Sequence, residues 1–290
     1  MPDFPSQFAV GQFDGDPHND IAAFGRQLCF GAGDCGPQLW LVPTTGAADI
    51  EPGGTKGAPA PTALPLVADG EKLEDIQGGA LLATVRLGPT GGDGPATDQV
   101  VVVVGGSPPL LYVATPSKGA FKLSPKVPLE KLGDSRLREL SVTVADVDGE
   151  RGADVIVASK KGMLVLWNQG SGGLDAGGDH ASFLSPDDLG QIACDGAQAS
   201  ASILGVGSIA ADADPARELL VSTGRVTYLV DQSRGKLAVS CLKGLPGGNA
   251  IAGGDVNGDG VDDLVIGRKG ALELFLAQPA DPGLDLTVGQ

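Results

Sequence analysis

The chain has 290 residues, with 46 glycines, 21 prolines and a formal net charge of -16. A chain this acidic repels phosphate backbones and anionic membrane surfaces, which argues against a nucleic-acid partner. Aromatic residues make up 4% of the chain, a composition that favours many short strands joined by turns. No run approaches the roughly 18 apolar residues of a membrane span, so we expect no membrane insertion. The first ten residues lack the apolar core of a signal peptide.

Five related units follow one another along the chain, with boundaries at 8–79, 80–139, 140–202, 203–249 and 250–290. Each has a Gly-, Ala- and Val-rich run, a loop, and three further β-rich runs. Repeats of this length with four strands each are typical of a β-propeller, whose sheets pack radially and bury apolar faces between neighbours. We predict an all-β, single-domain, five-bladed β-propeller of four-stranded antiparallel blades. A fragment of a propeller with more blades is the alternative, and a β-sandwich is a rival. Residues 128–140 could add one short helix.

The loop of the last unit has the spacing of a cation site. Asp255, Asn257, Asp259 and Asp263 offer side-chain oxygens at alternating positions, and the carbonyl of Val261 adds another. Hard cations such as Ca²⁺ take six to eight oxygen ligands, and glycines in the loop permit the tight turn. The flanking runs are strands, so the loop is not an EF-hand. The alternative is a turn whose Asp and Asn side chains cap their own backbone without metal.

Three other units carry related loops, and the second unit does not. The expected ligands are Asp146, Asp148, Glu150 and Asp154 with the Gly152 carbonyl in the third unit; Gln12, Asp14, Asp16 and Asp20 with the His18 carbonyl in the first; and Asp212, Asp214 and Glu218 in the fourth, where Ala210 removes one ligand. The sequence therefore predicts two to four Ca²⁺ sites.

The run DVNGDGVDDLVIG at 255–267 resembles the FG-GAP/VCBS repeats of integrin α-subunit propellers and of many secreted bacterial proteins and lectins. The resemblance covers essentially the whole chain as five units, but only the loop and its two strands match closely. It implies a calcium-stabilised extracellular propeller used for adhesion or ligand binding, or as an accessory to an enzyme. Function varies widely within such a fold, so the resemblance does not fix the ligand.

Basic residues gather in the turns between the second and third strands of the units. These turns lie on the face opposite the metal loops, because strands alternate in direction. The residues are Arg26, Lys160, Lys161, Arg225, Arg268 and Lys269. One hypothesis is a basic ring that binds an acidic protein partner or an anionic glycan. The alternative is that hairpin turns simply favour solvated polar residues.

The four cysteines suit two disulfides in an exported protein. A Cys29–Cys35 bond would close a small surface loop, and a Cys194–Cys241 bond would join blades three and four through their connecting segments. Other pairings stay open.

Catalytic motifs are absent: the two histidines, His18 and His180, read as loop residues, and no G-x-S-x-G, HExxH or P-loop occurs. We expect Trp40 and Trp167 to pack between blades. The sequence therefore predicts a monomeric calcium-binding propeller, extracellular, cell-surface or periplasmic, which is not an enzyme and binds a protein or glycan ligand. A lectin-like propeller is the first alternative, and a polysaccharide-active enzyme or its accessory domain is the second.

Overall fold

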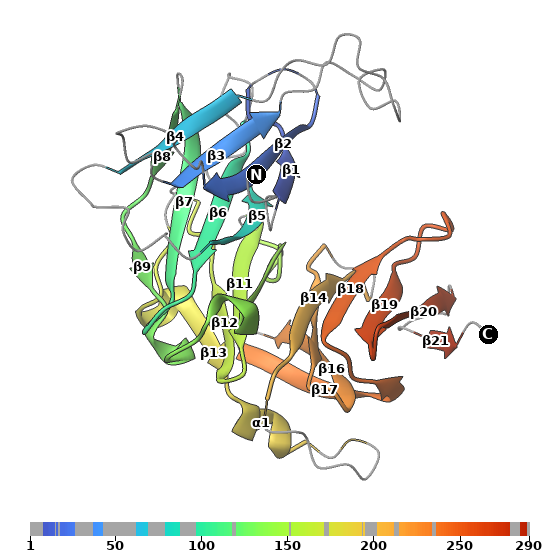
Figure 1. The fold of residues 1–290 in the computed structure, drawn as a ribbon. Helices are drawn as coiled ribbons and strands as arrows, with labels where there is room; N and C mark the ends of the chain where they lie inside the picture. Colours follow the sequence, from blue (N-terminus) through green and yellow to red (C-terminus); the bar gives the residue numbers. More distant parts are fainter. Residues whose placement is uncertain are drawn as a thin grey trace.

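The protein consists of short antiparallel strands grouped into five blades, which confirms the predicted fold class (Figure 1). The computed structural model describes residues 8–14, 16, 18–26, 37–42, 62–68, 79–87, 97–117, 120–150, 152–170, 174–192, 194, 202–211, 215–233, 236–278 and 285–288.

The blades follow one another in chain order. The first two contain β1 (Phe8–Gly11), β2 (Asp20–Arg26), β3 (Pro37–Val42) and β4 (Thr62–Ala68), then β5 (Leu81–Val85), β6 (Gln99–Val104), β7 (Leu110–Ser117), β8 (Ala120–Leu123) and the short β9 (Val127–Pro128). The third contains β10 (Ser141–Ala145), β11 (Asp154–Ser159), β12 (Gly162–Leu166) and β13 (Ala181–Leu184). The last two contain β14 (Gly205–Ile209), β15 (Glu218–Ser222), β16 (Val226–Ser233) and β17 (Lys236–Pro246), then β18 (Ala250–Gly254), β19 (Asp263–Arg268), β20 (Ala271–Gln278) and β21 (Asp285–Val288).

Apolar packing between neighbouring blades forms the core. The inner strands β1, β5, β10, β14 and β18 each contact the next one along the chain. A separate cluster of buried side chains fills each of the four spaces between consecutive blades. Between the fourth and fifth blades, for example, Ile209 and Leu220 meet Ile251 and Ile266. Since a single sheet cannot bury both its faces, each blade depends on its neighbours for stability.

Small residues on the inner strands are required by close backbone approach. A Cβ added at Gly207 would lie 2.7 Å from the carbonyl oxygen of Ile251. A Cβ at Gly253 would collide with the carbonyl oxygen of Ser208 and lie 3.0 Å from Ile209 Cβ. The Gly- and Ala-rich inner runs of the sequence are therefore a packing constraint at the centre of the propeller.

Blades one and two are joined more closely than the sequence indicates. Strand β4 pairs in parallel with β8, with Leu66 opposite Phe121, so the two blades form one continuous sheet that also includes β9. The ring of Phe121 also meets the ring of Phe13 edge-to-face, with centroids 6.2 Å apart. The sequence could not predict this parallel pairing, because it joins outer strands of two blades and is not part of the repeated pattern.

Helical structure is minor. The segment predicted to hold a short helix forms two 3-10 turns instead, η3 (Glu130–Leu132) and η4 (Leu137–Glu139), separated by Gly133 at a φ of 61°. A third turn is η5 (Gly178–His180), and the α-helix is α1 (Pro186–Gly190), started by a reciprocal hydrogen-bonded cap between Ser185 and Asp188. Within the described residues, no helix is long and apolar enough to cross a membrane.

A disulfide joins Cys194 to Cys241, which are separated by 47 positions in sequence and have Cα atoms 5.5 Å apart. Cys194 lies in the segment between α1 and β14, as predicted. Cys241 lies within β17, the outer strand of the fourth blade, and not in a connecting segment as the sequence analysis expected. The bond therefore fixes the connection between blades three and four to the edge of blade four. Cys29 and Cys35 lie outside the described residues.

Crowding at the inner strands can be tested with two neighbouring glycines of β18. We expect Gly253→Ala to lower the free energy of unfolding by about 1–3 kcal/mol, because the new methyl group has no space beside β14. The matched control is Gly254→Ala, where an added Cβ meets nothing within 4 Å. Urea unfolding would measure both variants. Equal stability of the two variants would contradict this account of inner-strand packing.

Candidate metal loops and the opposite face

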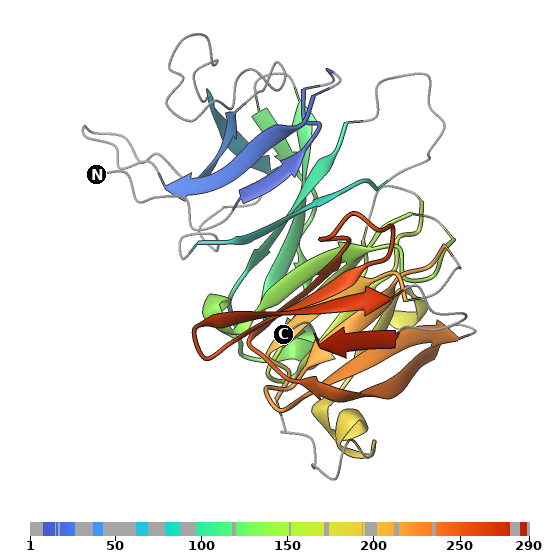
Figure 2. The same cartoon turned by 90° about the vertical axis from the view of Figure 1, so that its right-hand side faces the viewer.

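The alternation of strand direction places two kinds of loop at opposite ends of the blades. The first and second strands of each blade are joined at one end, here named the metal-loop end. The second and third strands are joined at the other end, here named the basic end. Figures 1 and 2 show the blades from two directions at right angles.

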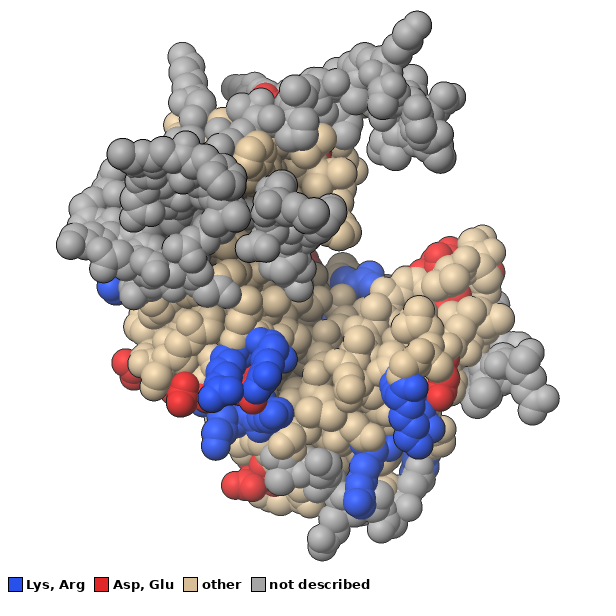
Figure 3. All heavy atoms as spheres, viewed as in Figure 1, with Lys and Arg blue, Asp and Glu red and all other residues tan. Residues whose placement is uncertain are grey.

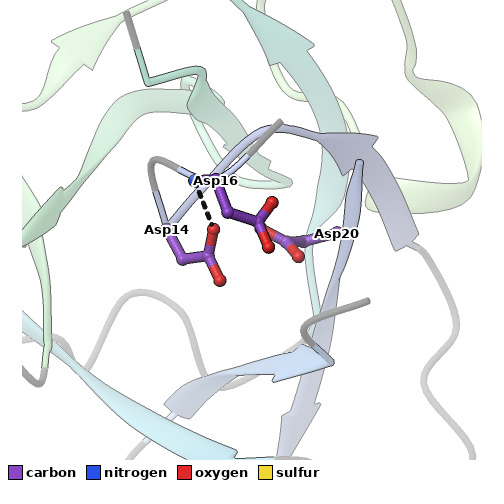
Figure 4. Close-up of side chains that lie close together, drawn as sticks. All are labelled: Asp14, Asp16 and Asp20. Carbon is purple, nitrogen blue, oxygen red and sulfur yellow. Dashed lines mark hydrogen bonds between the residues drawn. The ribbon is translucent and has the colours of Figure 1, made fainter. Parts of the chain in front are cut away.

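Three acids converge in the loop between β1 and β2. Asp14, Asp16 and Asp20 each place an oxygen within 4.8 Å of the other two (Figure 4). The loop backbone orders these acids, since Asp16 N–H donates to Asp14 Oδ1 at 3.0 Å and His18 N–H donates to Asp16 Oδ1 at 2.7 Å. Gln12, predicted as a fourth ligand, donates its side-chain N–H to the Asp16 carbonyl oxygen. The donor set fits a hard divalent cation.

The loop between β10 and β11 repeats this arrangement. Asp146, Asp148 and Asp154 offer oxygens that all lie within 4.8 Å of one another. Glu150, also predicted as a ligand, does not belong to this group, and its backbone N–H donates to Asp148 Oδ1 at 2.9 Å. Three carboxylates at such distances repel one another unless a cation or protons neutralise them. This loop is therefore a second candidate cation site.

The loop with the best spacing in sequence is arranged differently. Asp255 Oδ2 accepts the Gly260 N–H at 2.9 Å, and hydrogen bonds from the loop backbone lower the pKa of its carboxyl group. Asn257 donates its side-chain N–H to Asp259 Oδ2 at 2.9 Å. Within the described part of the chain, Asp255, Asp259 and Asp263 do not form a convergent group like the other two. The loop thus has the self-capped geometry that the sequence analysis kept as its alternative.

The fourth loop is held by an ion pair. Arg217 pairs with Asp262, a residue of the fifth blade, and Asp262 Oδ2 also accepts the Ala210 N–H at 2.9 Å. The predicted ligands Asp212 and Asp214 lie outside the described residues. At this position, a positive charge from the chain itself neutralises an acid that lies between two blades.

One hydrogen bond recurs in all five blades, and we call it the loop clamp. The first residue of the second strand accepts, through a side-chain oxygen, the N–H of the second residue after the inner strand. The pairs are Asp20 with Phe13 (3.0 Å), Gln99 with Leu87 (3.1 Å), Asp154 with Val147 (2.9 Å), Glu218 with Ala211 (2.7 Å) and Asp263 with Val256 (3.0 Å). Four of these acceptors were predicted from the sequence as metal ligands, and the hydrogen bond that they share with Gln99 was not predicted.

In two blades the clamp acid also accepts an N–H from the third strand or from the residues just after it. Asp154 Oδ1 accepts the N–H of Asn168 at 2.8 Å, and Asp263 Oδ1 accepts that of Ala277 at 2.9 Å. Both carboxylates are fully buried. Since an unpaired buried N–H is costly, these acids stabilise the fold whether or not a cation is present. They still have lone pairs available for a cation.

The chemistry of Asp154 links the clamp to the cation site. Burial raises the pKa of the Asp154 carboxyl to about 7, and the nearby charges of Asp148 and Asp146 act in the same direction. Hydrogen bonds from the Asn168 and Val147 backbone act against this rise. Burial also raises the pKa of Asp146. A bound cation would reverse this balance by favouring the ionised acids.

Neighbouring loops are joined to one another at the metal-loop end. In each contact, the first residue of one loop binds the residue just before the second strand of the following blade. The contacts are Gln12 N–H to Asp98 Oδ2 (2.9 Å), Arg217 N–H to the Asp146 carbonyl oxygen (2.7 Å) and the Ala210 bond to Asp262 already described. The loops therefore connect blades as well as strands.

The predicted cations occupy the basic end, but two are engaged by acids. Lys160 Nζ lies 3.2 Å from Glu139 Oε1, and Arg268 Nε lies 2.8 Å from Glu273 Oε1. The other basic-end side chains that the structure describes, Lys161, Arg225 and Lys269, are exposed. Arg26 ends β2, and its side chain lies outside the description. In Figure 3, Lys and Arg gather in two groups, one over the third blade and one over the last two blades.

A small cavity adjoins these cations. It has a volume of about 280 Å³ and lies between the start of β5, the β6–β7 turn and the segment before β10. Its lining comprises Gly79, Gly105, Gly106, Asp134, Ser135, Arg136 and Leu137. Gly105 is needed because the segment before β10 packs directly on it: a Cβ at Gly105 would collide with the backbone nitrogen of Leu137. Lys131, Arg136 and Arg138 were not predicted from the sequence as part of this basic end, although all three lie within residues 128–140.

The aromatic and histidine predictions have mixed outcomes. Trp167 is buried between blades three and four, as expected, and its Nε1–H donates to Ser182 Oγ at 3.2 Å. Trp40 is half-buried on the face of blade one that has no neighbouring blade, so it does not pack between blades. His180 ends η5, where its carbonyl oxygen accepts the Trp167 N–H at 2.9 Å.

Five blades of short antiparallel strands define a β-propeller, and two of its loops carry converging acids at one end of the blades. Residues 247–278, in the last blade, match the family model described as the FG-GAP repeat, which confirms the predicted resemblance there. A search of curated protein sequences finds no match.

Solved structures with a similar fold include two β-rich binding proteins. One is an Agrocybe aegerita lectin that recognises non-reducing terminal N-acetylglucosamine, with a TM-score of 0.51 and 16% identity over 96% of this chain. The other is BBS1N in complex with ARL6DN, with a TM-score of 0.50 and 11% identity over 97% of this chain. The chain spans 64% of the lectin chain and 68% of the BBS1N chain, and at these identities the similarity is one of fold alone.

The clamp and the cation site can be separated by two substitutions in one loop. In the presence of a chelator, we expect Asp154→Asn to lower the free energy of unfolding by about 1–3 kcal/mol, since one of two buried N–H groups loses its acceptor. Asp148→Asn should change it by less than about 0.5 kcal/mol, because Asp148 is not the clamp residue. Chemical unfolding would measure both. A larger effect at Asp148 than at Asp154 would show that the loop clamp is unimportant.

The raised pKa of Asp154 predicts how pH and calcium interact. In calcium-free protein, its protonated form is favoured on folding, so this contribution to stability is present below pH 3.8 and is lost as pH rises through about 7. Calcium must displace that proton, so binding should tighten between pH 6 and pH 8 and release protons at pH 6. Calorimetry in two buffers of different ionisation enthalpy would measure the release. An affinity independent of pH would contradict the assignment of Asp154 as a ligand.

Proposed function

We propose that this protein is an extracellular binding module whose basic end recognises an acidic segment of a protein partner. The observation that carries the proposal is the glycine-lined cavity beside Arg136, surrounded by exposed cations in a chain of net charge -16. Fields from grouped charges attract ligands of opposite sign and determine their orientation. Proteins with a rigid scaffold commonly bind their ligands through the loops that the scaffold holds in place.

The cations lie on or beside the segment that lines one side of the cavity. Glu139 is linked both to Lys160, at 3.2 Å, and to the Arg136 N–H, at 3.3 Å. Lys161 Cγ would lie 3.9 Å from a Cβ at Gly133, which places this second lysine beside the same segment. Lys131 lies over the Phe183 ring, with Nζ 5.7 Å from its centroid. These contacts hold the cations on one surface, where a carboxylate-rich peptide would find several donors.

Calcium has a structural role in this proposal. Asp14, Asp16 and Asp20 would hold one ion, and Asp146, Asp148 and Asp154 would hold another. Bound calcium would supply positive charge that neutralises the converging acids and so stabilises the loops by mass action. The Asp255 loop would bind only after its self-capped side chains rearranged. All three loops lie at the end opposite the proposed binding surface.

The proposal assigns the protein no catalytic step. It places the chain outside the cell or in the periplasm, and the Cys194–Cys241 bond supports an oxidising compartment. The fold shared with a lectin keeps sugar binding as the second candidate, although the described basic end offers no exposed aromatic ring for stacking on a sugar.

Charge reversal tests the binding surface. Immobilised poly-L-glutamate should retain the protein at low salt, and the double variant Arg136→Glu, Lys161→Glu should weaken this binding by about tenfold or more. The matched control is Lys236→Glu, which reverses an exposed charge in the turn between β16 and β17 at the metal-loop end. Surface plasmon resonance would measure all three proteins.

Two outcomes would overturn the proposal. Equal losses in the basic-end variant and in the Lys236→Glu control would show attraction without a defined surface. Salt-resistant binding to a glycan on an array, with no binding to poly-L-glutamate, would favour the lectin-like function instead.

A further inference from the structure

Within the residues that the structure describes, the first and the last blade each have one sheet face without a neighbouring blade. For clarity, the face that a blade turns toward the following blade is its trailing face, and the face toward the preceding blade is its leading face. Among the inner strands, β1 contacts β5, β5 contacts β10, β10 contacts β14 and β14 contacts β18. The described residues of β18 and β1 make no comparably close contact. Figure 3 shows a notch in the surface between these two ends of the molecule.

The trailing face of the fifth blade is apolar and exposed. Leu272 and Leu274 of β20 are 78% and 38% exposed. Strand pairing places Leu274 opposite Val265, and Val265 opposite Ala252, so the face is apolar across three strands. The β18–β21 sheet is the part of the molecule nearest the viewer in Figure 2. Large exposed apolar side chains that lie together on one face indicate a surface that another molecule covers.

The leading face of the first blade has the same character. Phe8 and Val10 of β1 are 66% and 49% exposed. Val10 pairs with Ile21 of β2, and Phe8 lies in register with half-buried Trp40 through the intervening β2. Four of the five large apolar residues that are strongly exposed in the described chain lie on these two faces, and the fifth is Val256 in the β18–β19 loop.

The repeat itself indicates what fits these faces. Between the fourth and fifth blades, the trailing face supplies Gly207, Leu220 and Leu229, and the leading face supplies Ile251 and Leu264. When the repeats are superposed, Ala252, Val265 and Leu274 of the fifth blade take the positions of Gly207, Leu220 and Leu229. Phe8 and Ile21 of the first blade take the positions of Ile251 and Leu264. The two open faces are therefore the two halves of one blade-to-blade contact.

We propose that the open trailing face of the fifth blade in one copy of this chain packs against the open leading face of the first blade in a second copy. The contact continues the series of blade interfaces already present within the chain. It is heterologous, because two different surfaces meet, so each copy offers one further face and assembly can extend beyond two copies. This replaces the monomer that the sequence predicts, and it is independent of the proposed binding surface.

Complementation between two variants tests this proposal on the full 290-residue chain. The wild-type protein should form species larger than a monomer as its concentration rises through the micromolar range, measured by analytical ultracentrifugation. Leu272→Asp and Phe8→Asp each remove one half of the contact, so each variant alone should stay monomeric. An equimolar mixture should form a one-to-one heterodimer and nothing larger, because exactly one intact half remains on each copy.

Val256→Asp is the matched control, since it places a charge on an equally exposed apolar residue away from both faces, and it should assemble like the wild type. Circular dichroism would establish that all variants are folded. The proposal is overturned if the wild type stays monomeric at every concentration, which would mean that the faces close on each other or are covered differently. It is also overturned if either single variant still self-associates, or if the mixed variants fail to pair.

Discussion

A single hydrogen bond, repeated five times, sets the shape of this propeller. In every blade, the first side chain of the second strand accepts the N–H of the second residue after the inner strand. The bond fixes how the chain turns from the innermost strand to the next one. Because the inner strands crowd together at the centre, this turn determines where each sheet points and therefore how neighbouring blades meet.

The loop clamp explains why loops of different chemistry have a side-chain oxygen at the same position. Gln99 serves as acceptor in a loop without the ligand spacing, and Glu218 serves in a loop that lacks a first ligand. Where the clamp acid is joined by two more carboxylates, as around Asp20 and Asp154, the loop becomes a candidate cation site. The acids of these candidate sites are thus additions to a structural hydrogen bond. The binding surface that we propose lies at the opposite end of the blades.

Regular features were predictable from the sequence, and contacts between distant segments were not. The blade number followed from repetition of the loop and its flanking runs, and the acid groups around Asp16 and Asp148 followed from their alternating spacing. The acids of the best-spaced loop did not converge, because the Asp255 carboxylate is held by the N–H groups of Gly258 and Gly260 within its own loop. The β4–β8 pairing and the Arg217–Asp262 pair join different blades, so no local pattern announces them. The cavity beside Arg136 likewise arises from packing between blades two and three.

The role of the loop clamp is tested most directly by amide hydrogen exchange, recorded by NMR in the presence of a chelator. The N–H groups to follow are the five clamp donors, those of Phe13, Leu87, Val147, Ala211 and Val256. The account predicts that all five exchange slowly, as buried strand amides do, because their acceptors are side chains that need no metal. Exchange at the fast rate of exposed loops, with protection gained only on adding calcium, would contradict it. That result would make the metal, and not the loop clamp, the interaction on which the blades depend.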